Sequence, residues 1–166
     1  MSKKTKRLTT LSALVAVAMI LSYLESLLPP LVAVPGVKVG FSNIATVVTL
    51  YILGAPSAIA VSVVRVLLSS LLFGNAASLI YSLSGAALAL AFMLLLKRLS
   101  VFSEVGVSIA GGVAHNAGQI IAACLLMENA GIAAYLPPLV VSGTLAGIAV
   151  GAVSVLLVKR LSRLKR

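Results

Sequence analysis

Apolar residues fill most of the chain in long runs that carry no charge. These runs lie at about 8–24, 44–64, 66–96, 105–127 and 129–158. Several of them exceed the roughly 20 helical residues that cross a hydrocarbon layer about 30 Å thick, so they must divide where Gly, Pro and Asn interrupt them. The pattern predicts an all-α integral membrane protein with a single transmembrane domain over residues 1–166. Its six helices are expected at about 8–28, 41–54, 57–73, 76–96, 105–127 and 136–158.

Basic residues gather in three clusters, at 3–7, 97–98 and 159–166. Six crossings place all three clusters on one side, which the positive-inside tendency identifies as the cytoplasm. Both termini are therefore expected in the cytoplasm. The basic start resembles a signal peptide, but the apolar run after it is about as long as a membrane span and lacks a small-x-small cleavage site. We expect this segment to be a retained first helix.

Composition excludes several classes of function. The net charge of +10 does not indicate a nucleic-acid-binding surface, because the basic residues cluster at the predicted membrane borders. Cys124 is the single cysteine and His115 the single histidine, so neither an internal disulfide nor a metal site is expected. Asp is absent, and the chain has no Asp-rich diphosphate motif, nucleotide-binding Gly loop or Ser/His/Asp set. We expect no enzyme activity from this chain alone and no cofactor.

Arg65 lies near the middle of the predicted third helix, where a cation is costly and normally faces a partner inside the bundle. The three carboxylates, Glu25, Glu104 and Glu128, all lie at predicted helix ends, and none is at an obviously matching depth. Arg65 therefore either joins helices by hydrogen-bonding to backbone carbonyls or pairs with an anionic ligand.

The stretch GGVAHNAGQI at 111–120 places three polar side chains inside the predicted fifth helix. His115 and Gln119 are four residues apart and share a helix face, with Asn116 on its flank. Together they offer both hydrogen-bond donors and acceptors. They either contact a ligand or hold neighbouring helices together, and the glycines around them let a neighbour or a ligand approach closely.

Four more residues are candidate ligand contacts toward the predicted outer side. Lys38 and Asn43 lie in or just after the connection expected at about 28–42, and Asn75 and Tyr81 lie at the start of the fourth helix. Polar groups at helix interfaces are common, so each residue alone is weak evidence for a site. The evidence is that these residues all lie toward the outer half of the predicted bundle. The set contains few aromatic residues, which favours an anionic molecule over a flat ring stacked on Trp.

Small residues recur on two helices. Gly143, Gly147 and Gly151 are spaced four apart on the sixth, which predicts close packing within the bundle. On the first helix, Ser12, Ala13 and Ala16 belong to small-x-x-x-small pairs. That face is suited to packing inside the protein or to docking on another subunit.

Five stretches carry a resemblance to a known family: PGVKVGFSNI (35–44), RVLLSSLLFGN (65–75), YSLSGA (81–86), VGVSIAGGVAHNAGQI (105–120) and YLPPLVVSG (135–143). In this order they resemble the bacterial Gx transporter family, whose members are often labelled heptaprenyl diphosphate synthase component I. The size and six-helix layout are similar to those of the S components of energy-coupling factor (ECF) transporters. The resemblance implies a multi-pass protein of the bacterial cytoplasmic (inner) membrane that captures substrate near its outer face.

The same resemblance implies partners. An S component docks on a membrane coupling subunit that carries two ATPases, using small residues of its first helix. The corresponding positions here are Ser12, Ala13 and Ala16, with Ser12 standing where alanine is usual.

Three hypotheses follow. The leading one is a substrate-binding component of an ECF-type uptake transporter for a small anionic metabolite, with Arg65 on the anionic group and His115, Asn116 and Gln119 orienting the rest. The alternative, implied by the synthase label, is a non-catalytic membrane subunit that recruits a soluble polyprenyl diphosphate synthase in isoprenoid-quinone biosynthesis. A third is an assembly factor whose polar residues only pack helices.

Overall fold

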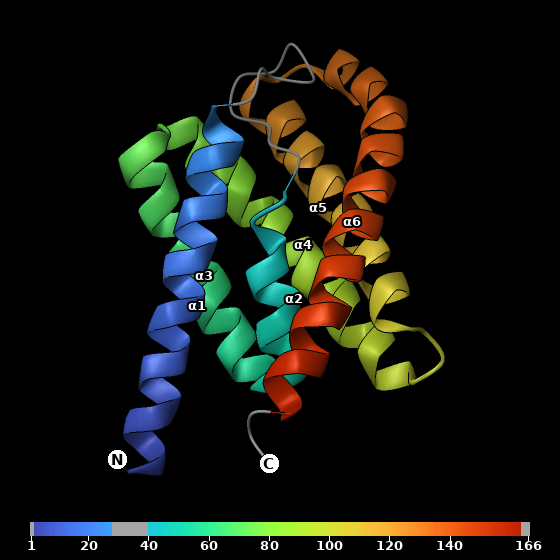
Figure 1. The fold of residues 1–166 in the computed structure, drawn as a ribbon. Helices are drawn as coiled ribbons and strands as arrows, with labels where there is room; N and C mark the ends of the chain where they lie inside the picture. The colour runs from blue at the N-terminus through green and yellow to red at the C-terminus, as the bar shows by residue number, and fades with distance from the viewer. Residues whose placement is uncertain (1, 28–39, 164–166) are drawn as a thin grey trace.

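The computed structural model describes residues 2–27 and 40–163. This part of the chain is all helical and contains six α-helices, as the apolar pattern predicts (Figure 1). Their bounds are α1 Lys3–Ser26, α2 Asn43–Ile52, α3 Ala55–Phe73, α4 Ala76–Leu99, α5 Glu104–Leu126 and α6 Leu136–Arg163, with a 3₁₀ helix, η1, at Ala130–Tyr135. The predicted number and order of helices are confirmed, with ends shifted by a few residues.

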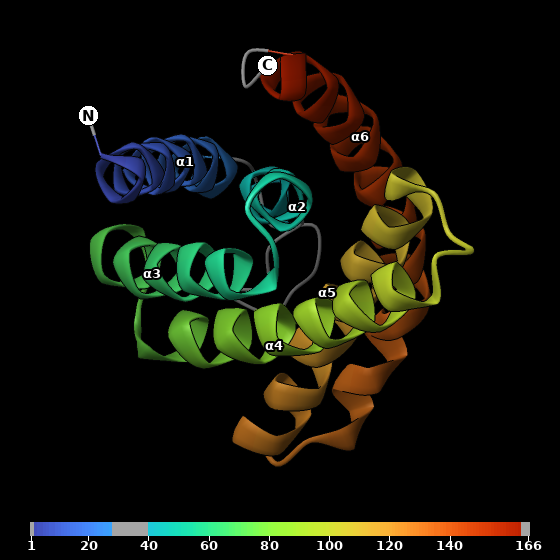
Figure 2. The ribbon, with the colours of Figure 1, turned by 90° about the horizontal axis from the view of Figure 1, so that it is seen from below.

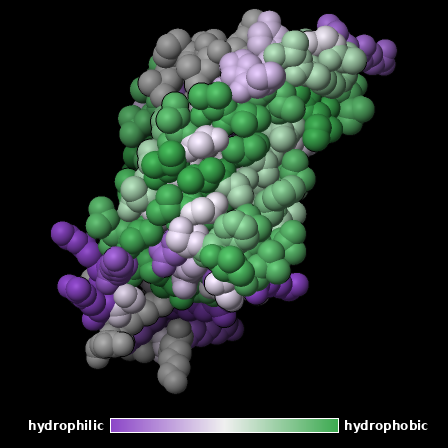
Figure 3. Space-filling model, turned by 90° about the vertical axis from the view of Figure 1, so that its right-hand side faces the viewer, coloured by the Kyte–Doolittle hydropathy of each residue, from purple (hydrophilic) through white to green (hydrophobic). Residues whose placement is uncertain are grey.

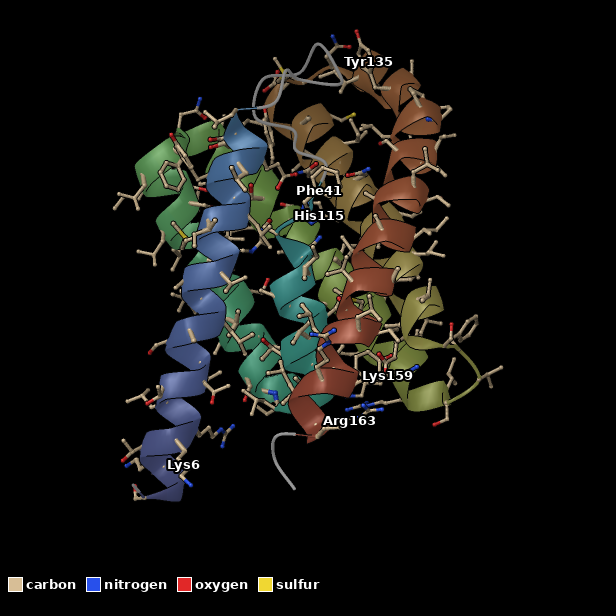
Figure 4. All side chains as sticks on the ribbon, in the orientation of Figure 1. Lys6, Phe41, His115, Tyr135, Lys159 and Arg163 are labelled. Carbon is tan, nitrogen blue, oxygen red and sulfur yellow. The ribbon has the colours of Figure 1, made fainter. Side chains whose placement is uncertain are left out.

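Five of the helices are long and apolar enough to cross a membrane, and α2 is shorter. With 10 residues, α2 spans about 15 Å, roughly half of the hydrocarbon layer. Its first turn follows Gly40, whose φ of +92° is a conformation that residues with a Cβ rarely adopt. Ser42 and Asn43, which open α2, are buried inside the bundle. Figure 4 labels Phe41 and His115 in the same region.

Local sequence signals set the helix boundaries. Gly54, at φ +85°, makes the tight turn into α3, and Pro56 lies in the first turn of α3, where its missing N–H is not needed. Asn75 caps α4, and Ser103 caps α5 by accepting a hydrogen bond from Gly106 N at 3.1 Å. These signals stop and restart the helix within apolar runs that are too long for one crossing.

The described basic clusters lie at one end of the bundle. Lys6, Lys159 and Arg163 are together at the lower end in Figure 4, and Tyr135 is at the opposite end. The turn from α4 to α5, which follows Lys97 and Arg98, is also at the lower end (Figure 1). In Figure 3 an apolar band separates a strongly hydrophilic lower end from an upper end with smaller hydrophilic patches. The chain is a multi-pass membrane protein with its described basic clusters on one side.

Glycines bring α5 close to both of its neighbours. A methyl group on Gly147 would come within 2.5 Å of Ile109 Cα, and one on Gly112 within 2.5 Å of the Gly143 carbonyl oxygen. On the other side of α5, a methyl group on Gly118 would lie 2.6 Å from Ser84 O. Gly143, Gly147 and Gly151 thus pack within the bundle, as predicted, because neighbouring backbones occupy the space of a side chain.

The helices form two groups. Figure 2 shows α4, α5 and α6 packed in succession, with α1 and α3 side by side on the other side of the molecule. Helix α2 lies between the groups and contacts α1, α3 and α6. The first turn of α2 is therefore the place where side chains of both groups can meet.

Candidate functional site

A network of buried charged and polar groups joins the first three helices. Arg65 on α3 donates from Nη1 to Ser42 Oγ and from Nη2 to Asn43 Oδ1 at 3.3 Å. Ser42 Oγ donates in turn to Glu25 Oε2 at 3.4 Å, and the Gly40 N–H donates to Glu25 Oε1. Glu25 and Arg65 are only 6% and 4% exposed. Two opposite charges are thus buried together and are connected through a serine hydroxyl.

This network corrects the expectation that no carboxylate lies at the depth of Arg65. Glu25 is at the end of α1, as expected, but it is buried against the start of α2. Ser42, just before α2, contacts both groups, so a residue at a helix end and one near a helix centre meet at the start of α2. Glu25 was not among the predicted site residues, and its position at a helix end gave no signal of burial.

His115 and Gln119 lie on the same side of α5 and both face α4, as their spacing of four residues predicts. A methyl group on Gly85 of α4 would lie 2.9 Å from His115 Nδ1 and 2.9 Å from Gln119 Cγ. The imidazole also reaches the start of α2, since a methyl group on Gly40 would lie 3.3 Å from its Cδ2. His115 therefore lies beside Gly40 and Asn43, which connects the α5 polar face to the Arg65 network.

Asn116 faces α6. Its Nδ2 donates to the Leu139 carbonyl oxygen at 2.7 Å and contacts Ser142 Oγ at 3.4 Å. For this side chain the structure shows the interhelical bond that was one of the two interpretations left open. Gly143 leaves room for it, because a methyl group there would lie 2.9 Å from Asn116 Nδ2.

Several fully buried polar atoms of this region have no hydrogen-bond partner among the described residues. They are Arg65 Nε, His115 Nδ1, Asn116 Oδ1 and both amide atoms of Gln119. Buried polar groups without partners cost about 1–3 kcal/mol each, so a group of them needs an explanation. A ligand or ordered water that supplies both donors and acceptors would remove this cost.

The described interior beside the network is tightly packed. A cavity of about 10 Å³ is lined by Gly40, Asn43, Met93, Gly111 and neighbouring residues. This is roughly the volume that one water molecule needs. This cavity by itself is too small for a metabolite.

The remaining candidate residues are not all in this cluster. Asn43 belongs to it, through its bond from Arg65. Tyr81 is buried in an apolar cluster with Ile120, Ile132 and Leu139, toward the η1 end of the bundle. Asn75 is exposed, and its side chain caps α4, accepting from Ser78 N at 2.8 Å. Lys38 lies outside the described residues.

The small residues Ser12, Ala13 and Ala16 lie on an exposed face of α1. They do not pack inside this chain, which leaves docking on another molecule or contact with lipid. Within residues 2–27 and 40–163, no group of three His, Cys, Asp or Glu side chains could hold a metal ion.

The fold matches that of a known membrane protein. The chain matches the structure of the S component of a bacterial ECF transporter with a TM-score of 0.75 and 22% sequence identity, over 99% of this chain and 100% of that one. The fold is therefore that of an ECF S component. A comparison with curated proteins gives no match.

The family is shown by the sequence. The model of the heptaprenyl diphosphate synthase component I family matches residues 14–157. The chain belongs to this family, which is the family to which the five stretches point.

Proposed function

We propose that this protein is the substrate-binding membrane component of an ECF-type uptake transporter for a small anionic metabolite. The observation that carries the proposal is the set of buried polar atoms without partners at Arg65, His115 and Gln119, among the described residues, in a chain with the S-component fold. Buried ionisable groups in membrane helices are costly and are usually functional. In this proposal the protein lies in a bacterial cytoplasmic membrane with its basic end in the cytoplasm.

Each polar side chain has a role in this proposal. Arg65 binds the anionic group of the ligand, because its planar guanidinium suits carboxylate and phosphate groups and its Nε is still free of protein partners among the described residues. Gln119 and His115 bind the other polar atoms of the ligand, since both side chains lie beside Gly85 of α4. Asn116 holds α6 in place through its Nδ2, so only its Oδ1 is left to accept a hydrogen bond from the ligand. Asn43 orients Arg65.

The ligand role of Arg65 is tested with Arg65→Gln in purified protein. We expect this variant to keep its fold and to lose the small molecule that co-purifies with the wild type. Arg7→Gln is the matched control, because Arg7 also donates to a serine hydroxyl, Ser57 Oγ at 2.9 Å. Normal ligand recovery from Arg65→Gln would rule out the proposed role.

The partners in this proposal are a membrane coupling subunit and its ATPases, which would dock on the exposed small residues of α1. This part rests on the S-component fold and on the exposure of Ser12, Ala13 and Ala16. Purification from the native membrane under mild detergent tests it: ATPase subunits are expected in the complex.

The family description supports a second candidate function, a non-catalytic membrane subunit of a polyprenyl diphosphate synthase. It predicts that the soluble synthase co-purifies with the chain and that no uptake depends on it. Recovery of the synthase without coupling or ATPase subunits would favour this function over transport.

A further inference from the structure

The start of α2 and Arg65 together form an arrangement that binds an anion. The Gly40 N–H, just before α2, and the Ser42 hydroxyl donate hydrogen bonds to an anion, and the guanidinium beside them adds a full positive charge. The anion found there is the carboxylate of Glu25, which accepts hydrogen bonds from the Gly40 N–H and the Ser42 hydroxyl. The guanidinium is not saturated, because the buried Nε of Arg65 has no partner among the described residues.

We propose that Glu25 occupies the anion subsite of the ligand-binding site, and that an anionic ligand binds by displacing it. This inference rests on the proposed function. A second carboxylate or a phosphate beside Arg65 would repel Glu25, since like charges a few ångströms apart in a poorly hydrated site interact strongly. The ligand and Glu25 therefore compete for Ser42 and Arg65.

This competition connects the site to α1. Glu25 lies near the end of α1, and only 17% of the apolar window of that helix is buried in the protein. The bonds of Glu25 to Gly40 and Ser42 join this end of α1 to the start of α2, while Tyr23 packs against Phe73 of α3. Displacement of Glu25 frees that end, and the same helix carries Ser12, Ala13 and Ala16 on its exposed face. Ligand occupancy would thus change how α1 is presented to a partner.

The test uses acetate and inorganic phosphate as probes of the subsite. Glu25→Ala removes the competing carboxylate and leaves space in which a free anion can take its place. Thermal unfolding of the purified full chain is measured against increasing acetate or phosphate, with chloride at equal ionic strength as the reference. We expect Glu25→Ala to be stabilised at concentrations on the order of tenfold lower than the wild type needs. Glu25→Ala combined with Arg65→Gln should not respond.

Two further variants make the result decisive. Glu128→Ala removes an exposed carboxylate and should respond to anions as the wild type does. Glu25→Gln keeps the size of the side chain but not its charge, so it carries the test if Glu25→Ala does not fold, and it should also respond more strongly than the wild type. If neither Glu25 variant responds more strongly than Glu128→Ala, Glu25 does not occupy an accessible anion subsite.

Different experimental results would contradict this inference and the proposed function. If Arg65→Gln loses the co-purified ligand while the Glu25 variants respond like the wild type, only the displacement of Glu25 is wrong. If Arg65→Gln keeps that ligand, the ligand role of Arg65 is wrong, and if no small molecule co-purifies with the wild type, the proposed function is wrong, whatever the Glu25 variants do.

Discussion

Glu25 of α1 and Arg65 of α3 meet through one hydroxyl group, that of Ser42. This serine opens α2, so the bridge links three helices in the interior of a membrane protein. Breaking such a bridge is costly, because each charged group would remain buried without one of its partners. The network is thus both a structural element and the centre of the proposed site.

The first prediction concerns this bridge. Ser42→Ala removes the hydrogen bonds to Arg65 Nη1 and Glu25 Oε2, and bonds to charged groups contribute about 1.5–3 kcal/mol each. We expect a loss of roughly 3 kcal/mol or more in the free energy of unfolding, measured by chemical denaturation in mixed micelles. Ser42→Thr keeps the hydroxyl and should retain most of the stability. Equal stability of Ser42→Ala and the wild type would show that the bridge is not formed in the membrane protein.

Asn116 and Gln119 should behave differently although they lie on the same helix. Asn116→Ala breaks the bond to Leu139 O, and interhelical bonds in membrane proteins contribute about 1 kcal/mol. Gln119→Leu replaces an amide without partners among the described residues with an apolar side chain of similar size. We expect Asn116→Ala to lower the melting temperature, and Gln119→Leu to leave it unchanged or raise it while abolishing ligand recovery. A marked loss of stability in Gln119→Leu would instead assign this residue to helix packing.

Glycine packing makes a third prediction. Gly147→Ala places a methyl group 2.5 Å from the backbone of Ile109, and overpacking of this kind costs typically 1–3 kcal/mol. On α5, Gly106→Ala meets no atom closer than 3.6 Å and should be tolerated. Thermal unfolding of the two variants compares them directly, and similar melting temperatures would contradict the close α5–α6 packing.

Asn75 makes a fourth prediction, because it caps α4. Asn75→Ala loses the cap and should lower the free energy of unfolding by about 1 kcal/mol. Asn75→Ser can still cap the helix and should retain stability. Neither variant should change ligand recovery from purified protein. If Asn75→Ala folds normally and loses the ligand, this residue belongs to the site after all.

The exposed face of α1 makes a fifth prediction. Ala16→Leu adds bulk to the face that carries Ser12 and Ala13 without disturbing the interior. We expect normal folding and ligand recovery but reduced recovery of coupling and ATPase subunits in pull-downs. Ala60→Leu makes the same change at an exposed position of α3 and should have no effect. Unchanged recovery of the subunits with Ala16→Leu would exclude this face as the docking surface.

Helix number and order could be predicted from the sequence because they depend on local properties. Long apolar runs, basic clusters and Gly or Pro breaks fix six helices and place the described basic clusters on one side. The packing role of Gly143, Gly147 and Gly151 could also be predicted from local sequence, because residues four apart share a helix face.

The site was only partly predictable because its pairs depend on tertiary structure. Glu25 and Arg65 are joined through Ser42, a tertiary contact that no spacing rule reveals. Asn116 and Gln119 are three residues apart, yet they face different neighbours because α5 lies between α4 and α6. Asn75 was grouped with the site for its depth, although an Asn three residues before a Ser at a helix start is also a typical cap.

The central claim is that this chain holds a small anionic molecule on Arg65. The most direct test is mass spectrometry of the small molecules released from equal amounts of purified wild type, Arg65→Gln and Arg7→Gln. We predict that one anionic compound is recovered near stoichiometrically from the wild type and from Arg7→Gln and is absent from a folded Arg65→Gln. Recovery of the same compound from all three proteins, or of no bound compound from any of them, would contradict the account.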